Sequence, residues 1–298
     1  MKPWSGVCNL CGSQTLETLR KIENSWHVRC AECGFIFTNP KPTAAEIKTF
    51  YDASYFTHSD GLSYGYRDYL KDKDNIIRSF AFIYKKLGKY IKPGHSLDVG
   101  CAYGFSLIAA EQCGWKARGI ELASDVAATA RSEFDLDVSS ITLADVFNLG
   151  ERYDLVTIWD VIEHLDDPMA MLRDAHAVLN PGGIIAIMTP NAGGFISRAM
   201  GDKWVMYQRG AVEHLCYFTP DTMRLALSKA GFETLKIARW GWGGKFVTVD
   251  FILTRLAHYM RFPFRLLSRA ARKAGAADWA VYADIGDNLV AVARKMPG

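Results

Sequence analysis

The stretch Ser96-Leu97-Asp98-Val99-Gly100-Cys101-Ala102-Tyr103-Gly104-Phe105 decides the fold. It is a short apolar run that ends on an acidic residue, followed by a turn with two glycines and then by an apolar segment of helical periodicity. This pattern predicts a strand, a tight turn and the start of a helix. Glycines let the backbone of such a turn approach a ligand, and the following helix presents unpaired N–H groups. The stretch is therefore typical of the first half of a nucleotide-binding fold.

An acidic residue also follows the next apolar run. Residues 116–120 predict the second strand, and Glu121 comes directly after it. A carboxylate at the end of the second strand of such a fold can bind both hydroxyls of a ribose. We expect a third strand over 141–144 that ends on Asp145 and Val146, a pair suited to the amino group and ring nitrogen of adenine.

Two further buried strands extend the series. Residues 153–159 predict the fourth strand, which leads into the polar turn 160–164, and Pro181-Gly182-Gly183 precedes a fifth apolar run over 184–188. Together with the glycine turn, these motifs resemble the class I S-adenosylmethionine-dependent methyltransferases over about residues 75–240. The resemblance is closest to the small-molecule branch of that family, in which D-V-(I/L)-E-H follows the fourth strand.

The resemblance implies an α/β fold with a Rossmann-like sheet of seven strands, in the order 3-2-1-4-5-7-6 with the last strand antiparallel. It also implies S-adenosylmethionine as the methyl donor. Its binding residues would be Asp98, Gly100, Cys101 and Gly104 at the amino acid end, Glu121 and Leu122 at the ribose, Asp145 and Val146 at the adenine, and Trp159 and Asp160 closing the site. Ala102 stands where the family commonly has a third glycine, and we expect a slightly tighter turn there with the site intact.

Two histidines are candidates for a catalytic base. Methyl transfer is an in-line displacement, so a base is needed only where the nucleophile must lose a proton. Histidine titrates near neutral pH and suits that task. We predict His214 as the base, because it follows the fifth strand, where this fold usually builds its acceptor pocket. His164 is the alternative, and it can instead be a turn-forming partner of Glu163.

The insertion of about residues 190–218 is rich in aromatic and basic side chains, which suit a ring-bearing or phosphorylated acceptor. These side chains are Phe195, Trp204, Tyr207, Tyr217, Phe218, Arg198, Lys203 and Arg209. A sugar nucleotide, a glycolipid and a quinone-like phenol all meet this description. We predict methylation of a hydroxyl group, with C-methylation of a keto-sugar nucleotide as the alternative.

Two C-x-x-C pairs lie near the N-terminus and predict a zinc site. They are Cys8-Asn9-Leu10-Cys11 and Cys30-Ala31-Glu32-Cys33, each followed by a glycine. Four thiolates can bind Zn²⁺ tetrahedrally, and they leave no coordination position for a substrate. We therefore predict a structural zinc ribbon; the alternative is a pair of redox dithiols or disulfides.

The chain divides into three predicted parts: a zinc ribbon over 1–42, a linker and lid segment over 43–74, and the methyltransferase domain over 75–298. The lid segment is rich in aromatic residues, namely Tyr51, Tyr55, Phe56, Tyr64, Tyr66 and Tyr69, and begins with a short helix over 44–51. In the catalytic domain we expect helices over 74–90 and 221–231, and strands over 232–240 and 288–294.

About 45 residues separate the last two predicted strands, and this second insertion, over about 243–283, is basic. Its segment 251–274 interleaves apolar residues with cations, breaks at Pro263, and lies in a stretch without acidic residues between Asp250 and Asp278. Such a segment can contact an anionic membrane surface or bind a phosphorylated substrate. The alternative is a basic face that packs on its own domain or on a second subunit, so the oligomeric state stays open.

The chain is only mildly basic. The net charge of +3 and the pI of about 8.4 demand no polyanionic partner, and no DNA partner is expected. The first residues lack an apolar signal core, and no apolar run is long enough to span a bilayer, so we expect a cytoplasmic protein.

Three rival functions fit these motifs less well. An NAD-dependent dehydrogenase shares the glycine turn but would lack Asp145. An RNA methyltransferase commonly has a (D/N)-P-P-(Y/F) turn after the fourth strand, which the turn 160–164 of this chain does not match. The ribbon is also a poor site for a phosphate backbone, because Glu17 and Glu23 offset its few cations. A docking protein without enzymatic activity would carry a damaged site, whereas Glu121 and the glycine turn are intact.

Overall fold

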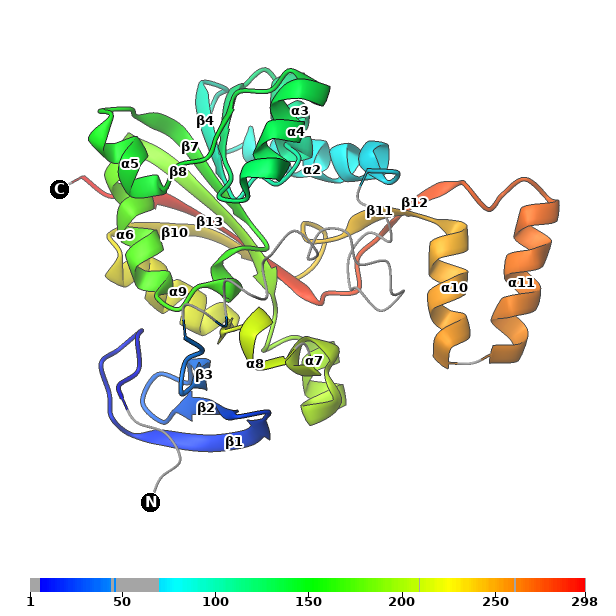
Figure 1. The fold of residues 1–298 in the computed structure, drawn as a ribbon, viewed down its shortest axis with the longest axis horizontal. Coiled ribbons are helices and arrows are strands. Elements are labelled where there is room, and N and C mark those ends of the chain that lie inside the picture. Colours follow the sequence, from blue (N-terminus) through cyan, green and yellow to red (C-terminus); the bar gives the residue numbers. More distant parts are fainter. Residues whose placement is uncertain (1–5, 44–45, 47–69, 209, 260, 298) are drawn as a thin grey trace.

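The computed structural model describes residues 6–43, 46, 70–208, 210–259 and 261–297 of the chain. Its centre is a seven-stranded sheet in the order β10-β13-β8-β7-β4-β5-β6 (Figure 1). The strands are β4 (His95–Val99), β5 (Lys116–Ile120), β6 (Val138–Ser139), β7 (Tyr153–Trp159), β8 (Leu179–Pro190), β10 (Phe232–Ala238) and β13 (Asn288–Lys295). β13 runs antiparallel to both neighbours, and β4 to β8 pair in parallel. The predicted strand order is confirmed.

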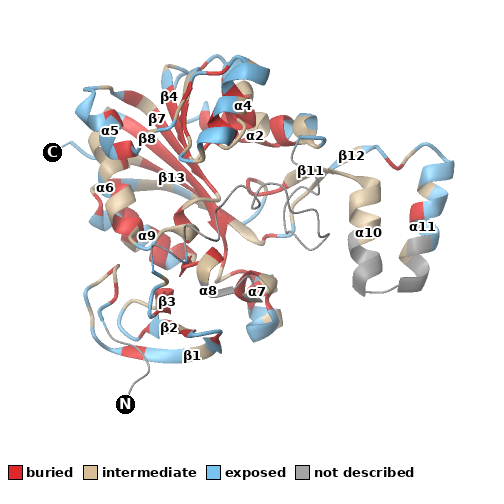
Figure 2. Ribbon diagram, in the orientation of Figure 1, coloured by how far each residue is buried: buried red, intermediate tan, exposed pale blue. Residues whose placement is uncertain are grey.

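Helices cover both faces of this sheet, which explains the nearly continuous apolar sequence of its central strands. One face carries α2 (Lys73–Leu87), α3 (Phe105–Gln112) and α4 (Ser124–Phe134), and the other carries α5 (Leu143–Asn148), α6 (Pro168–Val178) and α9 (Pro220–Lys229). Figure 2 shows the buried strands between these layers. α2 and α9 confirm the helices predicted over 74–90 and 221–231.

The third strand is shorter and lies earlier in the chain than predicted. β6 covers only Val138–Ser139, and the run 141–144 leads into α5 instead. The backbone N–H of Asp145 donates to Thr142 Oγ1 (3.2 Å), and the backbone N–H of Thr142 donates to the Asp145 carboxylate (2.8 Å). This capping box starts a helix and overrides the strand propensity of the run. The predicted strand over 141–144 is therefore wrong.

A second, antiparallel sheet joins the N-terminal segment to a distant part of the chain. Its order is β1 (Leu16–Ile22), β2 (Ser25–Cys30), β3 (Ile36–Asn39) and β9 (Cys216–Tyr217). β9 belongs to the insertion after β8, which also contains α7 (Phe195–Met200) and α8 (Gly210–Glu213). The ribbon and this insertion therefore share one sheet, which lies beside the central one (Figure 1).

Most aromatic side chains of this insertion pack beneath the ribbon. Trp204, Tyr207, Tyr217 and Phe218 are at most 9% exposed. Tyr217 Oη lies 3.1 Å from His27 Nε2 of the ribbon, and Arg20 donates to the carbonyl of Tyr207. The prediction that these four aromatic residues form the walls of an acceptor pocket is wrong, because the ribbon covers them. Phe195 alone among the five predicted residues is exposed.

The second insertion forms a helical hairpin that projects from the main body (Figure 1). Its elements are β11 (Lys245–Thr248), α10 (Val249–Tyr259), α11 (Arg261–Lys273) and β12 (Ala280–Ala283). Ser268 and Arg272 of α11 both donate to Asp250 of α10. The helical segment is interrupted, but before Pro263, since α10 ends at Tyr259 and α11 begins at Arg261. Pro263 lies in the first turn of α11, where its missing N–H costs no helical hydrogen bond.

Some expectations concern residues that the structure leaves undescribed. The predicted lid over 43–74 lies mostly outside the described residues, and so do its aromatic patch, most of the helix predicted over 44–51, and Arg209. Within the described part of the chain, no helix combines the length and the apolar character that a membrane span requires.

Candidate active site

The glycine turn between β4 and α3 has a left-handed backbone at three of its positions. Gly100, Ala102 and Gly104 have φ values of 72°, 48° and 79°. A Cβ atom on Gly100 would lie 2.6 Å from Val161 Cγ2, and one on Gly104 would lie 2.4 Å from Leu136 Cδ1. Both positions therefore favour glycine by conformation and by space. Ala102 adopts the same conformation at a cost on the order of 1 kcal/mol.

Glu121 is fixed against this turn by two backbone N–H groups. The N–H of Ala102 donates to Oε2 (3.0 Å), and the N–H of Ala123 donates to Oε1 (2.9 Å). Each carboxylate oxygen keeps a further lone pair, so the group can accept two more hydrogen bonds from a diol. Leu122 is 71% exposed beside it and offers an apolar surface. This arrangement supports the ribose site predicted from the sequence, which stays a prediction.

Asp98 lies beneath the turn in a buried polar network that the sequence motifs did not predict. It is 2% exposed, and Thr157 Oγ1 of β7 donates to its Oδ1 at 2.6 Å. Ser106 Oγ accepts from Trp159 Nε1 at 2.9 Å and lies 3.1 Å from Tyr84 Oη. Thr157, a polar residue inside the apolar run of β7, is the feature of the sequence that could have indicated this network.

Burial raises the pKa of Asp98 from 3.8 to about 7, and hydrogen bonds from Thr157 and Ser106 oppose this rise. Between pH 4 and pH 7 the folded state therefore binds a proton at Asp98 that the unfolded state has released. The free energy of unfolding falls as pH rises through this window.

Asp98→Asn, which cannot ionise, should remove this pH dependence. We expect the variant to have a Tm several degrees above that of the unchanged protein at pH 8, with the difference shrinking toward pH 5.5. Thermal unfolding without ligand from pH 5.5 to 8 measures this, with Asp174→Asn on α6 as the control. Parallel pH profiles for the unchanged protein and Asp98→Asn would refute the assignment.

The other predicted cofactor residues lie around the turn in different ways. Cys101 and Val146 are buried, and burial raises the pKa of the Cys101 thiol, so this thiol stays neutral. Asp145 caps α5, and Trp159 packs in the core against Phe80 of α2, with ring centroids 5.8 Å apart. The roles of these residues in cofactor binding stay predictions.

Asp160 follows β7 with a left-handed backbone (φ 53°). Its Oδ2 lies 3.7 Å from Lys245 Nζ, which belongs to β11. The base of the projecting hairpin therefore contacts the edge of the sheet where the candidate site lies.

The structure brings the two predicted catalytic histidines together. The rings of His164 and His214 are 4.8 Å apart at 72°, although fifty residues separate them in the chain. His164 lies in a 3-10 turn (Ile162–His164) after β7, and its Nδ1 is 2.6 Å from the carbonyl oxygen of Glu213. His214 is 4% exposed.

Glu163 completes this cluster from beneath. Its side chain is 2% exposed, Thr189 Oγ1 of β8 donates to its Oε2 at 3.0 Å, and its Oε1 lies 4.0 Å from His164 Nε2. Burial raises the pKa of Glu163 well above its ordinary range. The ligand atoms of Glu163, His164 and His214 all lie within 4.8 Å of one another, a donor set that can also bind a divalent cation.

The zinc ribbon holds the backbone beside His214. The N–H of Thr38 in β3 donates to the carbonyl of Leu215 (2.9 Å), and Thr38 Oγ1 donates to the carbonyl of His214 (3.3 Å). On the other side, the N–H of Leu215 donates to the carbonyl of Glu163 (2.8 Å). The position of His214 therefore depends on the ribbon, a contact that the sequence did not reveal.

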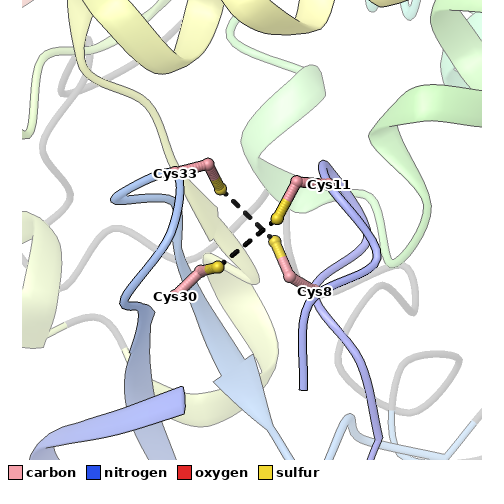
Figure 3. Close-up of side chains that lie close together, drawn as sticks. All are labelled: Cys8, Cys11, Cys30 and Cys33. Atoms are coloured by element: carbon pink, nitrogen blue, oxygen red, sulfur yellow. Dashed lines mark hydrogen bonds between the residues drawn. The ribbon is translucent and has the colours of Figure 1, made fainter. Parts of the chain in front are cut away.

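The four predicted zinc ligands converge from two turns (Figure 3). Sγ atoms are 3.6 Å apart for Cys8 and Cys33, and 3.4 Å apart for Cys11 and Cys30. Four sulfurs about 2.3 Å from one zinc ion would be separated by about 3.8 Å, so the cluster fits a Cys₄ zinc site. All four sulfurs lie within 4.8 Å of one another, as one ion requires.

Residues 73–237, more than half of the chain, match a family model described as a methyltransferase domain. The chain belongs to this family. The match runs from α2 to β10 and contains the glycine turn, Glu121 and both histidines.

Curated relatives of this methyltransferase domain include two ubiquinone biosynthesis O-methyltransferases. The chain is 30% identical over 146 residues to that of Cereibacter sphaeroides (strain ATCC 17025 / ATH 2.4.3), covering 46% of this chain and 59% of the relative. It is 27% identical over 175 residues to that of Azorhizobium caulinodans, covering 56% of this chain and 69% of the relative. The chain thus spans about three-fifths of the first of these relatives.

Solved methyltransferases share the fold at low sequence identity. Magnesium protoporphyrin IX methyltransferase from Synechocystis PCC 6803, with bound S-adenosylhomocysteine, has a TM-score of 0.52 and 12% identity, covering 85% of this chain and all of that chain. The plantazolicin methyltransferase, also with S-adenosylhomocysteine, has a TM-score of 0.53 and 16% identity, covering 84% of this chain and 93% of that one. These values support the methyltransferase fold.

Proposed function

We propose that this protein transfers a methyl group from S-adenosylmethionine to a hydroxyl group of a ring-bearing small molecule. The observation that carries the proposal is that a fixed carboxylate, Glu121, and a histidine pair lie at the carboxyl edge of the parallel strands of one sheet. Relatives named as O-methyltransferases support oxygen as the acceptor atom. Hydroxyl groups of sugars, glycolipids and phenols are the acceptor classes that the proposal covers.

Binding of the cofactor falls to the glycine turn and its two carboxylates. S-adenosylmethionine supplies, when bound, a methyl group activated by a sulfonium. Glu121 would accept hydrogen bonds from the ribose hydroxyls, and Asp98 beneath the turn would attract the amino acid end. The remaining work of the protein is to orient the acceptor in line with the methyl group and to exclude water.

His164 is the better candidate for the base. A carbonyl oxygen can only accept, so the contact with the Glu213 carbonyl places the proton on Nδ1 and leaves Nε2 as the acceptor nitrogen. His164 Nε2 would take the hydroxyl proton as the acceptor oxygen attacks the methyl group, and the sulfonium of the bound donor would leave as a thioether. This preference reverses the order expected from the sequence, in which His214 came first.

The ribbon supports a small-molecule acceptor over RNA. Arg20, one of its few cations, donates to the carbonyls of Asp202 and Tyr207 in the first insertion. A cation used in this way is not available to a phosphate backbone.

Transfer of labelled methyl groups tests the proposal. Zinc-loaded protein, S-adenosylmethionine and a panel of phenols, sugar nucleotides and glycolipids should yield a methyl ether and one equivalent of S-adenosylhomocysteine for at least one acceptor class. Mass spectrometry locates the methyl group. Transfer to carbon, or to nitrogen of RNA, would contradict the proposal.

A further inference from the structure

A cavity of about 190 Å³ opens beside the first insertion. It lies between α7, the end of β10 and the segment that follows β8. The residues that line it include Asn191, Gly194, Phe195, Arg198, Arg239 and Trp240. Asn191 lies two residues beyond Thr189, which donates to Glu163 of the histidine cluster.

The cavity carries two arginines whose charges are not neutralised. Arg198 and Arg239 are exposed, and neither forms an ion pair with a carboxylate among the residues that the structure describes. The nearby carboxylates have other donors: Asp287 accepts from Trp204 Nε1, and Asp284 accepts from the N–H groups of Gly241 and Gly286. Two guanidinium groups at one cavity are the usual recognition elements for a phosphate.

A buried amide supplies an independent indication of a ligand. Asn191 is fully buried, and within the described residues its Nδ2 has no hydrogen-bond partner. Its Oδ1 accepts from the N–H of Gly193 (3.1 Å), which fixes the orientation of the amide. Nδ2 lies on the side of Gly194, 3.3 Å from where a Cβ atom would stand. An unpaired buried donor is costly, and Asn191 is one of the residues that line the cavity, so an acceptor bound there would offer this amide a partner.

Two exposed aromatic rings flank the same cavity. Phe195 is 75% exposed and Trp240 is 57% exposed. The Trp240 ring lies against Gly286, where a Cβ atom would stand 2.6 Å from Cε2, so glycine is required for the ring to lie there. Flat apolar faces beside cationic groups suit a ligand that joins a ring to a phosphate.

We propose that this cavity binds the phosphate or diphosphate group of the acceptor, with Arg198, Arg239 and Asn191 Nδ2 as donors and with Trp240 and Phe195 covering the attached ring. The claim that the bound phosphate belongs to the methyl acceptor rests on the proposed methyl transfer. The claim that the cavity binds an anion does not depend on it. The proposal narrows the acceptor to a phosphorylated, ring-bearing molecule.

Calorimetric titration at low salt tests the proposal with inorganic pyrophosphate and with uridine diphosphate. Arg198→Gln and Arg239→Gln should each weaken pyrophosphate binding about tenfold or more, whereas Arg224→Gln, an arginine of α9 paired with Asp221, should leave it unchanged. Uridine diphosphate should bind more tightly than pyrophosphate, and Trp240→Leu should abolish this difference in affinity. Equal affinities for the unchanged protein and both pocket variants, or no pyrophosphate binding at all, would overturn the proposal.

Titration with S-adenosylhomocysteine on the same samples separates the two proposals. The pocket variants should bind it as the unchanged protein does and should keep its Tm. If the unchanged protein binds pyrophosphate through both arginines but does not bind S-adenosylhomocysteine, the anion site is supported and the proposed methyl transfer is contradicted. If only the pyrophosphate prediction fails, the methyl transfer stands without a phosphorylated acceptor.

Discussion

Replacing His164 by asparagine is expected to lower kcat by roughly 10²–10⁴-fold, the usual contribution of a positioned base. The asparagine amide can still donate to the carbonyl of Glu213, as Nδ1 of His164 does, but it lacks the acceptor nitrogen Nε2. Binding of S-adenosylhomocysteine should stay the same, because Glu121 and the glycine turn are untouched. Steady-state kinetics with the best acceptor, together with calorimetry, measure both quantities.

Two comparisons make this result specific to a base. Added imidazole should restore part of the rate of His164→Asn, since it can accept the proton that the side chain no longer takes. His214→Asn should lose less activity, because His214 supports the ring of His164 across 4.8 Å. A larger loss in His214→Asn, with rescue by imidazole there only, would transfer the role of the base to His214.

Loss of the zinc ion is expected to unfold the ribbon and to reduce methyl transfer at least a hundredfold. Zinc binding supplies about 10 kcal/mol or more to domains of this size. Two of the four zinc ligands, Cys8 and Cys30, are themselves buried side chains of the ribbon. Without β3, the backbone at His214 and Leu215 loses its hydrogen bonds to Thr38. Zinc chelation and Cys11→Ser, followed by circular dichroism, activity and cofactor titration, measure the effect.

Thr38→Val provides a test that leaves the zinc site intact. It removes only the bond from Oγ1 to the His214 carbonyl, worth about 1 kcal/mol, and should lower kcat a few-fold at full zinc content. Full activity after complete removal of zinc would show that the ribbon does not support the active site.

The sequence predicted the parts of the fold that depend on local motifs. The glycine turn, Glu121 and the apolar runs of the central strands are each readable over a few residues, and their order along the chain matches the seven-stranded sheet. The cysteine pairs are readable in the same way, because the spacing within each pair sets the geometry of the ligands.

The parts that failed depend on competing or distant contacts. The run before Asp145 has the composition of a strand, yet Thr142 and Asp145 cap a helix there. The aromatic residues of the first insertion suggested a pocket, but Tyr217 packs under His27 of the ribbon, almost two hundred residues away. No local sequence pattern predicts a contact between residues so far apart in the chain. The same reason hides the link from Thr38 to His214, and with it the part that the ribbon plays at the site.

Titration of zinc-loaded protein with S-adenosylhomocysteine, alongside Glu121→Ala, is the most direct test of the proposed cofactor site. We expect micromolar binding. Because Glu121 would accept two hydrogen bonds from the ribose hydroxyls, Glu121→Ala should weaken this binding by roughly 10–100-fold. The control Glu133→Ala, on the exposed face of α4, should leave the affinity unchanged. Absence of binding to fully zinc-loaded protein, or equal affinity in Glu121→Ala, would contradict the proposed cofactor site and the function built on it.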